Sequence, residues 1–326
     1  MTIAPELQVP ERRSISVVTP VYNGEASLDE LCRRLAEVLS RISGQHEVIL
    51  VNDGSRDRSW EVILELSLRT PAVRGVNLMR NYGQHNALLC GIRAAKYDVI
   101  VTMDDDLQHQ PEEIPRLVAR LEEGFDVVYA TPDRERHGFW RAIASRMTRL
   151  ALRSAAGAEV ARNVSAFRAF RTELRDAFAG YQAPFVSIDV LLTWATSRFA
   201  SVRVPFKPRQ SGSSNYTFAK LVRHAFDMMT GFSTAPLQLA SLIGFGCTLF
   251  GVAVLIYVVG RYFVEGSIPG FPFLASIIAI FSGAQLFALG VIGEYLARMH
   301  FRTMNRPGYA IRDTVDGEGS KMQSQE

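Results

Sequence analysis

Three consecutive carboxylates, Asp104, Asp105 and Asp106, directly follow an apolar run. Neighbouring ionised carboxylates raise each other's pKa, so a positive group is expected among them. Mg²⁺ and Mn²⁺ take oxygen ligands, commonly one or two carboxylates together with substrate phosphates. At the end of a strand, Asp104 and Asp106 would face the same side, and Gln108 would add a carbonyl oxygen. The spacing predicts a Mg²⁺ or Mn²⁺ site at these three residues; the alternative is a solvated acidic loop that caps the helix beginning at Pro111.

The first 130 residues, which must position these acids, alternate β-rich runs with helical patterns. The expected strands are 15–21, 46–53, 73–79, 97–104 and 125–130, and the expected helices are 28–39, 60–68, 85–95 and 114–121. Continuous Val/Ile strands that alternate with amphipathic helices predict an α/β fold with a mostly parallel sheet. A further helix at 185–197 and a strand at 201–207 follow a looser, arginine-rich stretch.

Polar residues gather where these strands end. They are 20–23 after the first strand, 52–55 after the second, 80–83 after the third, and the acid triplet after the fourth. In parallel sheets ligands bind beyond the carboxyl ends of the strands. We therefore expect the four turns to form one site, although any single turn is equally compatible with simple capping.

Two long uncharged runs, 228–260 and 266–293, lie near the C-terminus. Each exceeds the roughly 20 residues that a helix needs to cross a bilayer. They predict transmembrane helices at 236–262 and 270–297; the alternative is a pair of buried core helices. Residues 215–235 carry a polar stripe at helical spacing and are expected to form an amphipathic helix in the headgroup plane, or else one packed on the domain.

Basic residues flank the predicted hairpin on one side. They are Lys220, Arg223 and His224 before it, and Arg298, Arg302 and Arg306 after it. The positive-inside rule then places the large N-terminal domain and both termini in the cytoplasm of a multi-pass plasma (inner) membrane protein. The expected organisation is an N-terminal extension at 1–13, an α/β domain at 14–214 and a cytoplasmic tail at 298–326. The tail is expected to be disordered after Ile311.

Composition excludes several function classes. The chain has 326 residues and a formal net charge of only +3, which gives no electrostatic case for a nucleic-acid partner. Cys32, Cys90 and Cys247 show neither zinc-ligand nor disulfide spacing.

Four ordered motifs and the hairpin together resemble a known family. The motifs are SVVTPVYNGEASL, VNDGSRDRS, RNYGQHNAL and MDDDLQHQPEEIPRL, with RQSGSSNYTF and GEYLAR…RPGY nearer the C-terminus. They are similar to family 2 glycosyltransferases with the GT-A fold, and more narrowly to the polyprenyl-phosphate branch. That branch includes enzymes for mannose, glucose and formamido-arabinose. The resemblance covers roughly residues 14–309.

The resemblance implies a nucleotide site and a metal site. Nucleotide contacts would come from Pro20, Tyr22, Glu25, Asp53, Asp104 and Arg209. Pro20 and Tyr22 would line the base and ribose, and Asp53 would accept the N3–H of a uracil-type base. Asp104 and Asp106, with Gln108, would hold the divalent ion.

For the acceptor phosphate, the expected residues are Arg134, Arg136, Arg168, Arg209, Ser214 and Tyr216. Solvated charges are the alternative for Arg134 and Arg136. The implied reaction is an inverting transfer of a sugar from a nucleotide-diphosphate sugar, with a uridine donor preferred, to a polyprenyl phosphate such as undecaprenyl phosphate. A homo-oligomer, a tetramer in the family, is also implied.

The chain departs from the family pattern at three positions. Gly24 stands where the family often has Glu, Arg162 where it often has a possible base Asp, and Asn215 where it usually has Lys. Asp189 is the candidate substitute base, with solvation of a helix surface as the alternative role. The competing functions are a non-catalytic membrane-anchored nucleotide-sugar binder and a GDP-mannose-dependent polyprenyl-phosphate mannosyltransferase.

Overall fold

A computed structural model describes residues 13–132, 164–182, 186–206, 235–265, 270–304 and 307–317. Several predicted features lie outside these ranges: the helix at 215–235 and the residues Arg134, Arg136, Arg162, Arg209, Ser214, Asn215 and Tyr216.

The described residues form one mixed sheet in the order β7-β5-β6-β4-β1-β2-β3-β8. The strands are β1 (Ile15–Val21), β2 (His46–Asn52), β3 (Val73–Leu78), β4 (Val99–Thr102), β5 (Val127–Pro132), β6 (Arg168–Arg171), β7 (Phe199–Val204) and β8 (Ile311–Val315). The neighbours of β1, and the pairs β2–β3 and β5–β7, run parallel, whereas β6 and β8 run antiparallel to their neighbours. The sheet is therefore mostly parallel, as predicted.

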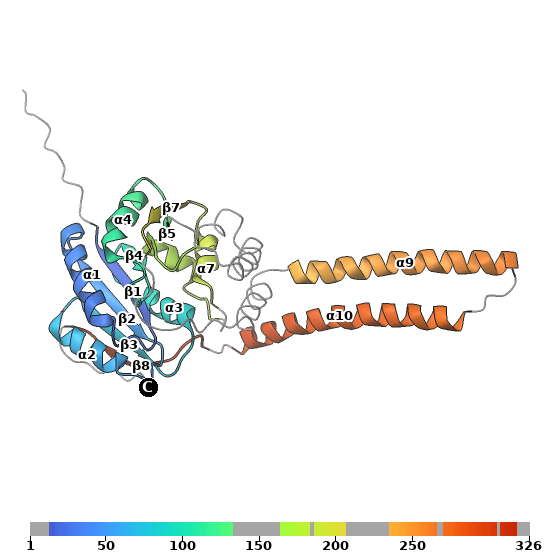
Figure 1. The fold of residues 1–326 in the computed structure, drawn as a ribbon, viewed down its shortest axis with the longest axis horizontal. Helices are drawn as coiled ribbons and strands as arrows, with labels where there is room; N and C mark the ends of the chain where they lie inside the picture. Colours follow the sequence, from blue (N-terminus) through green and yellow to red (C-terminus); the bar gives the residue numbers. More distant parts are fainter. Residues whose placement is uncertain are drawn as a thin grey trace, which may run out of the picture.

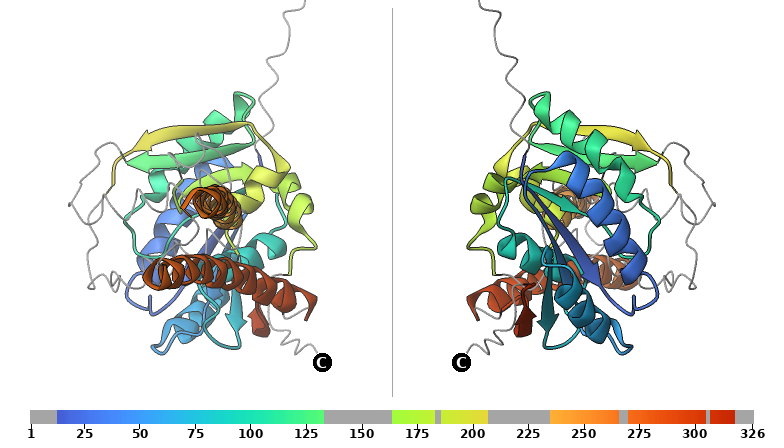
Figure 2. Two further views of the ribbon diagram at one scale, coloured as in Figure 1. Left: turned by 90° about the vertical axis from the view of Figure 1, so that its right-hand side faces the viewer. Right: turned by 90° about the vertical axis from the view of Figure 1, so that its left-hand side faces the viewer.

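Helices cover both faces of the sheet (Figures 1 and 2). They are α1 (Leu28–Ile42), α2 (Ser59–Arg69), α3 (Gln84–Ala94), η1 (Pro111–Glu113), α4 (Ile114–Glu122), η2 (Thr172–Phe178) and α7 (Ile188–Ala195). Helices α1, α2 and α4 pack into one apolar cluster, and α3, η2 and α7 into the other. Helix α1 shows why: Leu28, Leu31, Leu35 and Leu39 recur at helical spacing and are fully buried.

Strand β8 corrects the expectation of a disordered tail. Residues Ile311–Val315 return after the apolar hairpin and pair antiparallel with β3 at the edge of the sheet. Side chains fix this strand, because Asn77 donates to Asp313 at 3.2 Å and Arg74 to Asp316 at 2.6 Å. A short, half-polar edge strand carries no strong β pattern in its own sequence. The hydrogen-bond ladder that stabilises it is supplied by its partner strand, β3.

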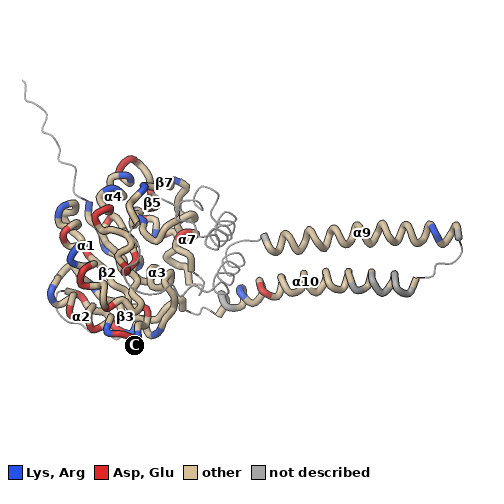
Figure 3. The backbone as a smooth tube through the Cα atoms, in the orientation of Figure 1, with Lys and Arg blue, Asp and Glu red and all other residues tan. Residues whose placement is uncertain are grey.

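Two long helices, α9 (Ala235–Glu265) and α10 (Phe271–Thr303), project side by side from the domain (Figure 1). Within them, the segments Pro236–Val264 and Ile280–His300, of 29 and 21 residues, are long and apolar enough to cross a membrane, and neither is buried within the protein. Charge is confined to the ends of the helices (Figure 3). The helices pack closely at Gly251, where an added Cβ would lie 2.7 Å from the Phe281 ring.

Candidate active site

The turns after β1 and β2 are joined by a dense set of hydrogen bonds. Asn23, in the left-handed region at φ 54°, accepts from the Arg56 backbone N–H at 2.8 Å, and Gly24 N–H donates to Ser59 Oγ at 2.9 Å. Glu25 Oε2 accepts from the backbone N–H of Arg58 at 2.9 Å. The structure therefore gives Glu25 a role in holding the start of α2. Its contact with the nucleotide stays a prediction. Tyr22 is 48% exposed beside these bonds.

Asp53 links the turn after β2 to the turn after β3. It is 3% exposed, and its two carboxylate oxygens accept the backbone N–H groups of Tyr82 and Gly83 at 2.7 and 2.9 Å. Burial raises the pKa of Asp53 to about 6, although the two backbone donors lower it. A rigid acceptor is thus placed at the carboxyl edge of β2, where the resemblance puts the base-reading aspartate.

Asp104 and Asp106 occupy the turn after β4 and remain partly exposed. Gln84, at the start of α3, donates to Asp104 Oδ1 at 2.6 Å, so the turns after β3 and β4 also meet. Gln108 donates its backbone N–H to Asp106 Oδ1 at 3.1 Å, and its side-chain amide also contacts this carboxylate. Sequence analysis did not single out Gln84, although it lies within the quoted RNYGQH motif.

The middle acid, Asp105, turns inward. Its Oδ2 is buried without a hydrogen-bond partner in the described part of the chain. Burial, then the charges of Asp104 and Asp106, raise the pKa of Asp105 to about 7. The repulsion expected from three adjacent acids therefore adds to burial in raising the pKa of Asp105.

The donor set of this turn fits a divalent ion of the Mg²⁺ or Mn²⁺ type. Among the described residues no group of three or more His, Cys, Asp or Glu side chains could hold a metal. A closed protein cage is not required, because such ions are commonly bound by one or two carboxylates and the substrate's phosphates. Asp104 and Asp106 on one turn, with an adjacent amide from Gln108, meet that requirement.

Arg168 and Asp189 form a buried ion pair. Their side chains are 2% and 6% exposed, and Tyr129 Oη also donates to Asp189 at 3.0 Å, while Arg168 Nε donates to Thr102 Oγ1 at 3.1 Å. Burial and then the charge of Asp189 raise the pKa of Tyr129 well above its usual value, so the hydroxyl stays protonated. Solvation of a helix surface, the alternative role considered for Asp189, is therefore wrong. Its role as a base and the role of Arg168 at a phosphate stay predictions.

His109 is a further partly buried group that the sequence analysis did not single out. Its ring lies 5.3 Å from that of Phe167 and 5.4 Å from that of Phe206, and its Nδ1 is buried without a hydrogen-bond partner in the described residues. Burial lowers the pKa of His109. The neutral ring therefore packs against Phe167 and Phe206, and no local sequence signal distinguishes this role from a solvated one.

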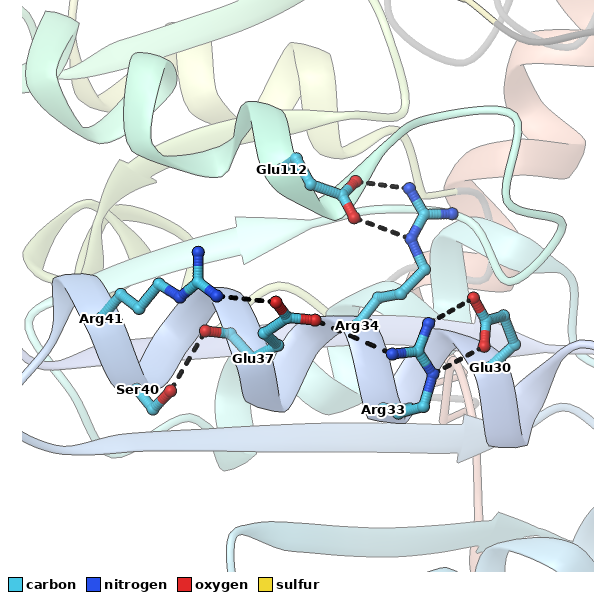
Figure 4. A network of polar contacts seen from close by, with 7 residues as sticks. All are labelled: Glu30, Arg33, Arg34, Glu37, Ser40, Arg41 and Glu112. Carbon is cyan, nitrogen blue, oxygen red and sulfur yellow. Dashed lines mark hydrogen bonds and ion pairs between the residues drawn. The ribbon is translucent and has the colours of Figure 1, made fainter.

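A cavity of about 560 Å³ lies beside this turn, between α1 and η1. Leu107 and Gln110 line it, together with the charged side chains of α1. Those side chains are already paired with one another and with Glu112, as Figure 4 shows. The chemistry therefore belongs to the strand edge rather than to this cavity.

Comparison with known proteins gives one family and a set of full-length relatives. Residues 16–178 match the model of glycosyl transferase family 2. The chain is 37% identical over 314 residues to an undecaprenyl-phosphate 4-deoxy-4-formamido-L-arabinose transferase from Pseudomonas paraeruginosa, covering 95% of this chain and 93% of that protein. The protein of the same name from Proteus mirabilis is 36% identical, covering 92% of this chain and 94% of that protein.

Solved structures share the fold. Glucosyl-3-phosphoglycerate synthase from Mycobacterium tuberculosis, crystallised with Mn²⁺, UDP-glucose and phosphoglyceric acid, matches with a TM-score of 0.51 and 20% identity over 67% of this chain and 79% of that chain. A second mycobacterial protein matches with a TM-score of 0.52 and 19% identity over 67% and 73%. The predicted GT-A type of α/β domain followed by two apolar helices is confirmed.

Proposed function

The chain belongs to glycosyl transferase family 2, and we propose that it transfers a sugar from a nucleotide-diphosphate sugar to undecaprenyl phosphate or a similar polyprenyl phosphate. The observation that carries this proposal is that the similarity to undecaprenyl-phosphate transferases spans 95% of the chain, so it includes both the catalytic domain and the apolar hairpin. The product would be a lipid-linked sugar for modification of envelope glycans.

The donor lies, in this proposal, across the carboxyl edge of β1, β2 and β4. Pro20 and Tyr22 form the wall for the nucleoside, and Asp53 accepts the N3–H of uracil. Support comes from the rigidity of Asp53, since both of its oxygens are fixed by backbone donors. The preference for a uridine donor comes from the family resemblance, and Asp53 is compatible with it because the N3–H of uracil needs an acceptor.

Asp104 and Asp106 would hold Mg²⁺ or Mn²⁺ with Gln108. When bound, the ion offsets the negative charge that develops on the departing diphosphate. The carboxylates are positioned for this by Gln84 on one side and by Gln108 on the other. Neither donor depends on the ion, so the two side chains are already oriented before the substrate arrives.

The transfer is proposed as a single displacement. An oxygen of the lipid phosphate forms a bond to the anomeric carbon, and the bond from that carbon to the diphosphate oxygen breaks, with the electron pair leaving on the nucleoside diphosphate. The configuration at the anomeric carbon is inverted. A phosphate monoester with a second pKa near 6 is largely ionised at neutral pH, so little is required of a general base.

The hairpin anchors this reaction at the bilayer surface. We place the catalytic domain and both termini in the cytoplasm, with Arg134, Arg136, Arg168, Arg209, Ser214 and Tyr216 as the acceptor-phosphate residues. Positive flanking charge supports the orientation. We also propose a homo-oligomer on the basis of the family.

The test uses the full chain in detergent with undecaprenyl phosphate and a panel of UDP- and GDP-sugars, each with Mg²⁺, Mn²⁺ or EDTA. We expect metal-dependent formation of a glycosylated lipid from a UDP-sugar. Transfer from GDP-mannose alone would favour the mannosyltransferase, and nucleotide binding without lipid product would favour the non-catalytic binder.

The role of the hairpin is tested by replacing residues 236–304 with a flexible linker. This variant keeps β8, which a simple truncation would remove from the edge of the sheet. We expect nucleotide binding to persist and lipid glycosylation to fall to background. Full activity on the lipid would contradict the proposed anchoring role.

A further inference from the structure

The neighbouring side chain of Asp105, and not a positive φ of its own backbone, favours glycine at position 24. Among the described glycines, only Gly54, Gly83 and Gly124 have positive φ values. A Cβ added at Gly24 would lie 2.2 Å from Asp105 Oδ2, a distance that real Cβ atoms essentially never show, and 3.1 Å from its Cγ, which is tight. The next contact, at 3.4 Å from Val21 Cγ1, is ordinary packing. A side chain at position 24 would therefore require the carboxylate of Asp105 to move.

Asp105 lies at the junction of the two turns that form the donor site. Its carboxylate lies against Gly24 in the turn that carries Tyr22, while its own backbone belongs to the turn that carries Asp104 and Asp106. Its Oδ2 is buried and makes no hydrogen bond within the described ranges. An unpartnered buried oxygen is costly, and a residue of this kind persists where it serves function more than stability.

We propose that Asp105 is a positioning residue for the donor: it fixes the Tyr22 turn to the turn that holds the metal. Gly24, which has no side chain, leaves the space that the Asp105 carboxylate occupies. This inference rests on the proposed function, because it assigns the nucleoside to Tyr22 and the metal to the flanking acids. It also gives a physical reason for the departure of Gly24 from the family pattern.

The Tyr22 turn is held on its other side without Asp105. Asn23 N–H donates to Ser55 Oγ at 3.0 Å, and Gly24 N–H donates to Ser59 Oγ at 2.9 Å. Loss of Asp105 therefore leaves the turn attached to the end of β2 and frees only its link to the acids. The expected consequence is weaker donor use with an intact fold.

The experiment is a double-mutant cycle on the full chain in detergent, with Gly24→Ala, Asp105→Ala and the combined variant. The matched control is Gly180→Ala, where an added Cβ meets nothing within 4 Å. We expect each single substitution to raise the KM for the UDP-sugar about tenfold and to leave the KM for undecaprenyl phosphate unchanged. In the Asp105→Ala background, Gly24→Ala should add nothing, because the clashing atoms are gone.

Two further measurements separate positioning from a structural role. Asp105→Ala should unfold at the same or a higher temperature, because it removes a buried oxygen without a partner. Asp105→Asn, which keeps the shape of the side chain against Gly24, should restore the donor KM to within about twofold of the original.

Three results would overturn the proposal: an unchanged donor KM in Asp105→Ala, a Gly24→Ala effect of equal size in both backgrounds, or a large fall in the unfolding temperature of Asp105→Ala with no change in KM. Failure of the proposed function would look different, because the unmodified chain itself would then form no glycosylated lipid. In that case the cycle is read from the affinity for UDP with Mn²⁺, with the same expected pattern.

Discussion

The buried pair of Arg168 and Asp189 gives the sharpest test of what holds the acceptor side of the site. Asp189→Asn keeps the shape of the side chain and removes its charge. The Arg168 guanidinium, 2% exposed, would then lose the carboxylate that neutralises it. Removing one partner of a buried pair costs about 3–5 kcal/mol. At roughly 2–4 °C per kcal/mol for a domain of this size, the unfolding midpoint should fall by about 6–20 °C.

The assay is thermal unfolding of the full chain in detergent, followed by tryptophan fluorescence. Trp194 on α7 reports on the helix that carries Asp189. The matched control is Glu30→Gln, which breaks the exposed pair with Arg33 in Figure 4 and should not shift the midpoint. The double variant Arg168→Met/Asp189→Leu should lose less stability than Asp189→Asn, since no unpaired charge remains.

The opposite pattern would refute this reasoning. If Asp189→Asn left the midpoint unchanged and lowered kcat by orders of magnitude, Asp189 would be acting on the substrate. The general-base role considered from the sequence would then regain its support. If the double variant were the least stable of the three, the pair would contribute more than the cost of burying its charges.

Three further predictions follow from the site and the sheet edge. Asp106→Asn should abolish the Mn²⁺-dependent increase in UDP affinity measured by calorimetry, and an unchanged metal dependence would remove Asp106 from the metal site. Asp53 has a pKa raised from 3.8 to about 6, so the folded state disfavours its charged form, and stability attributable to this group should fall by about 2 kcal/mol as pH rises from 4 to 7. Asp53→Asn should flatten that difference in pH-dependent unfolding, and an identical pH profile would contradict it. Asp313→Ala removes the acceptor of Asn77 and should speed amide hydrogen exchange in β3, whereas unchanged exchange would show that β8 does not protect this strand.

Local patterns in the sequence were sufficient for the main architecture. The strands and helices up to β5, and the two apolar segments, follow from periodicity and length, because each element buries its own apolar face whatever its neighbours are. The position of the acids also followed, since parallel strands bring their carboxyl ends to one edge. Asp104 lies at the end of β4, next to Gln84 at the start of α3, as this rule implies.

What the tertiary structure decided depends on partners far away in the chain. Asp189 and Arg168 reach each other only because α7 and β6 join the same apolar cluster, and this changes a solvated acid into a buried ion pair. β8 forms only because β3 presents an unpaired edge 236 residues earlier, as in the Asn77–Asp313 bond. Asp105 Oδ2 occupies the space of a side chain at position 24 only because the two turns have met. Periodicity describes which face of an element is apolar; it carries no information about which polar side chain will meet another, because that is fixed by packing across the sheet.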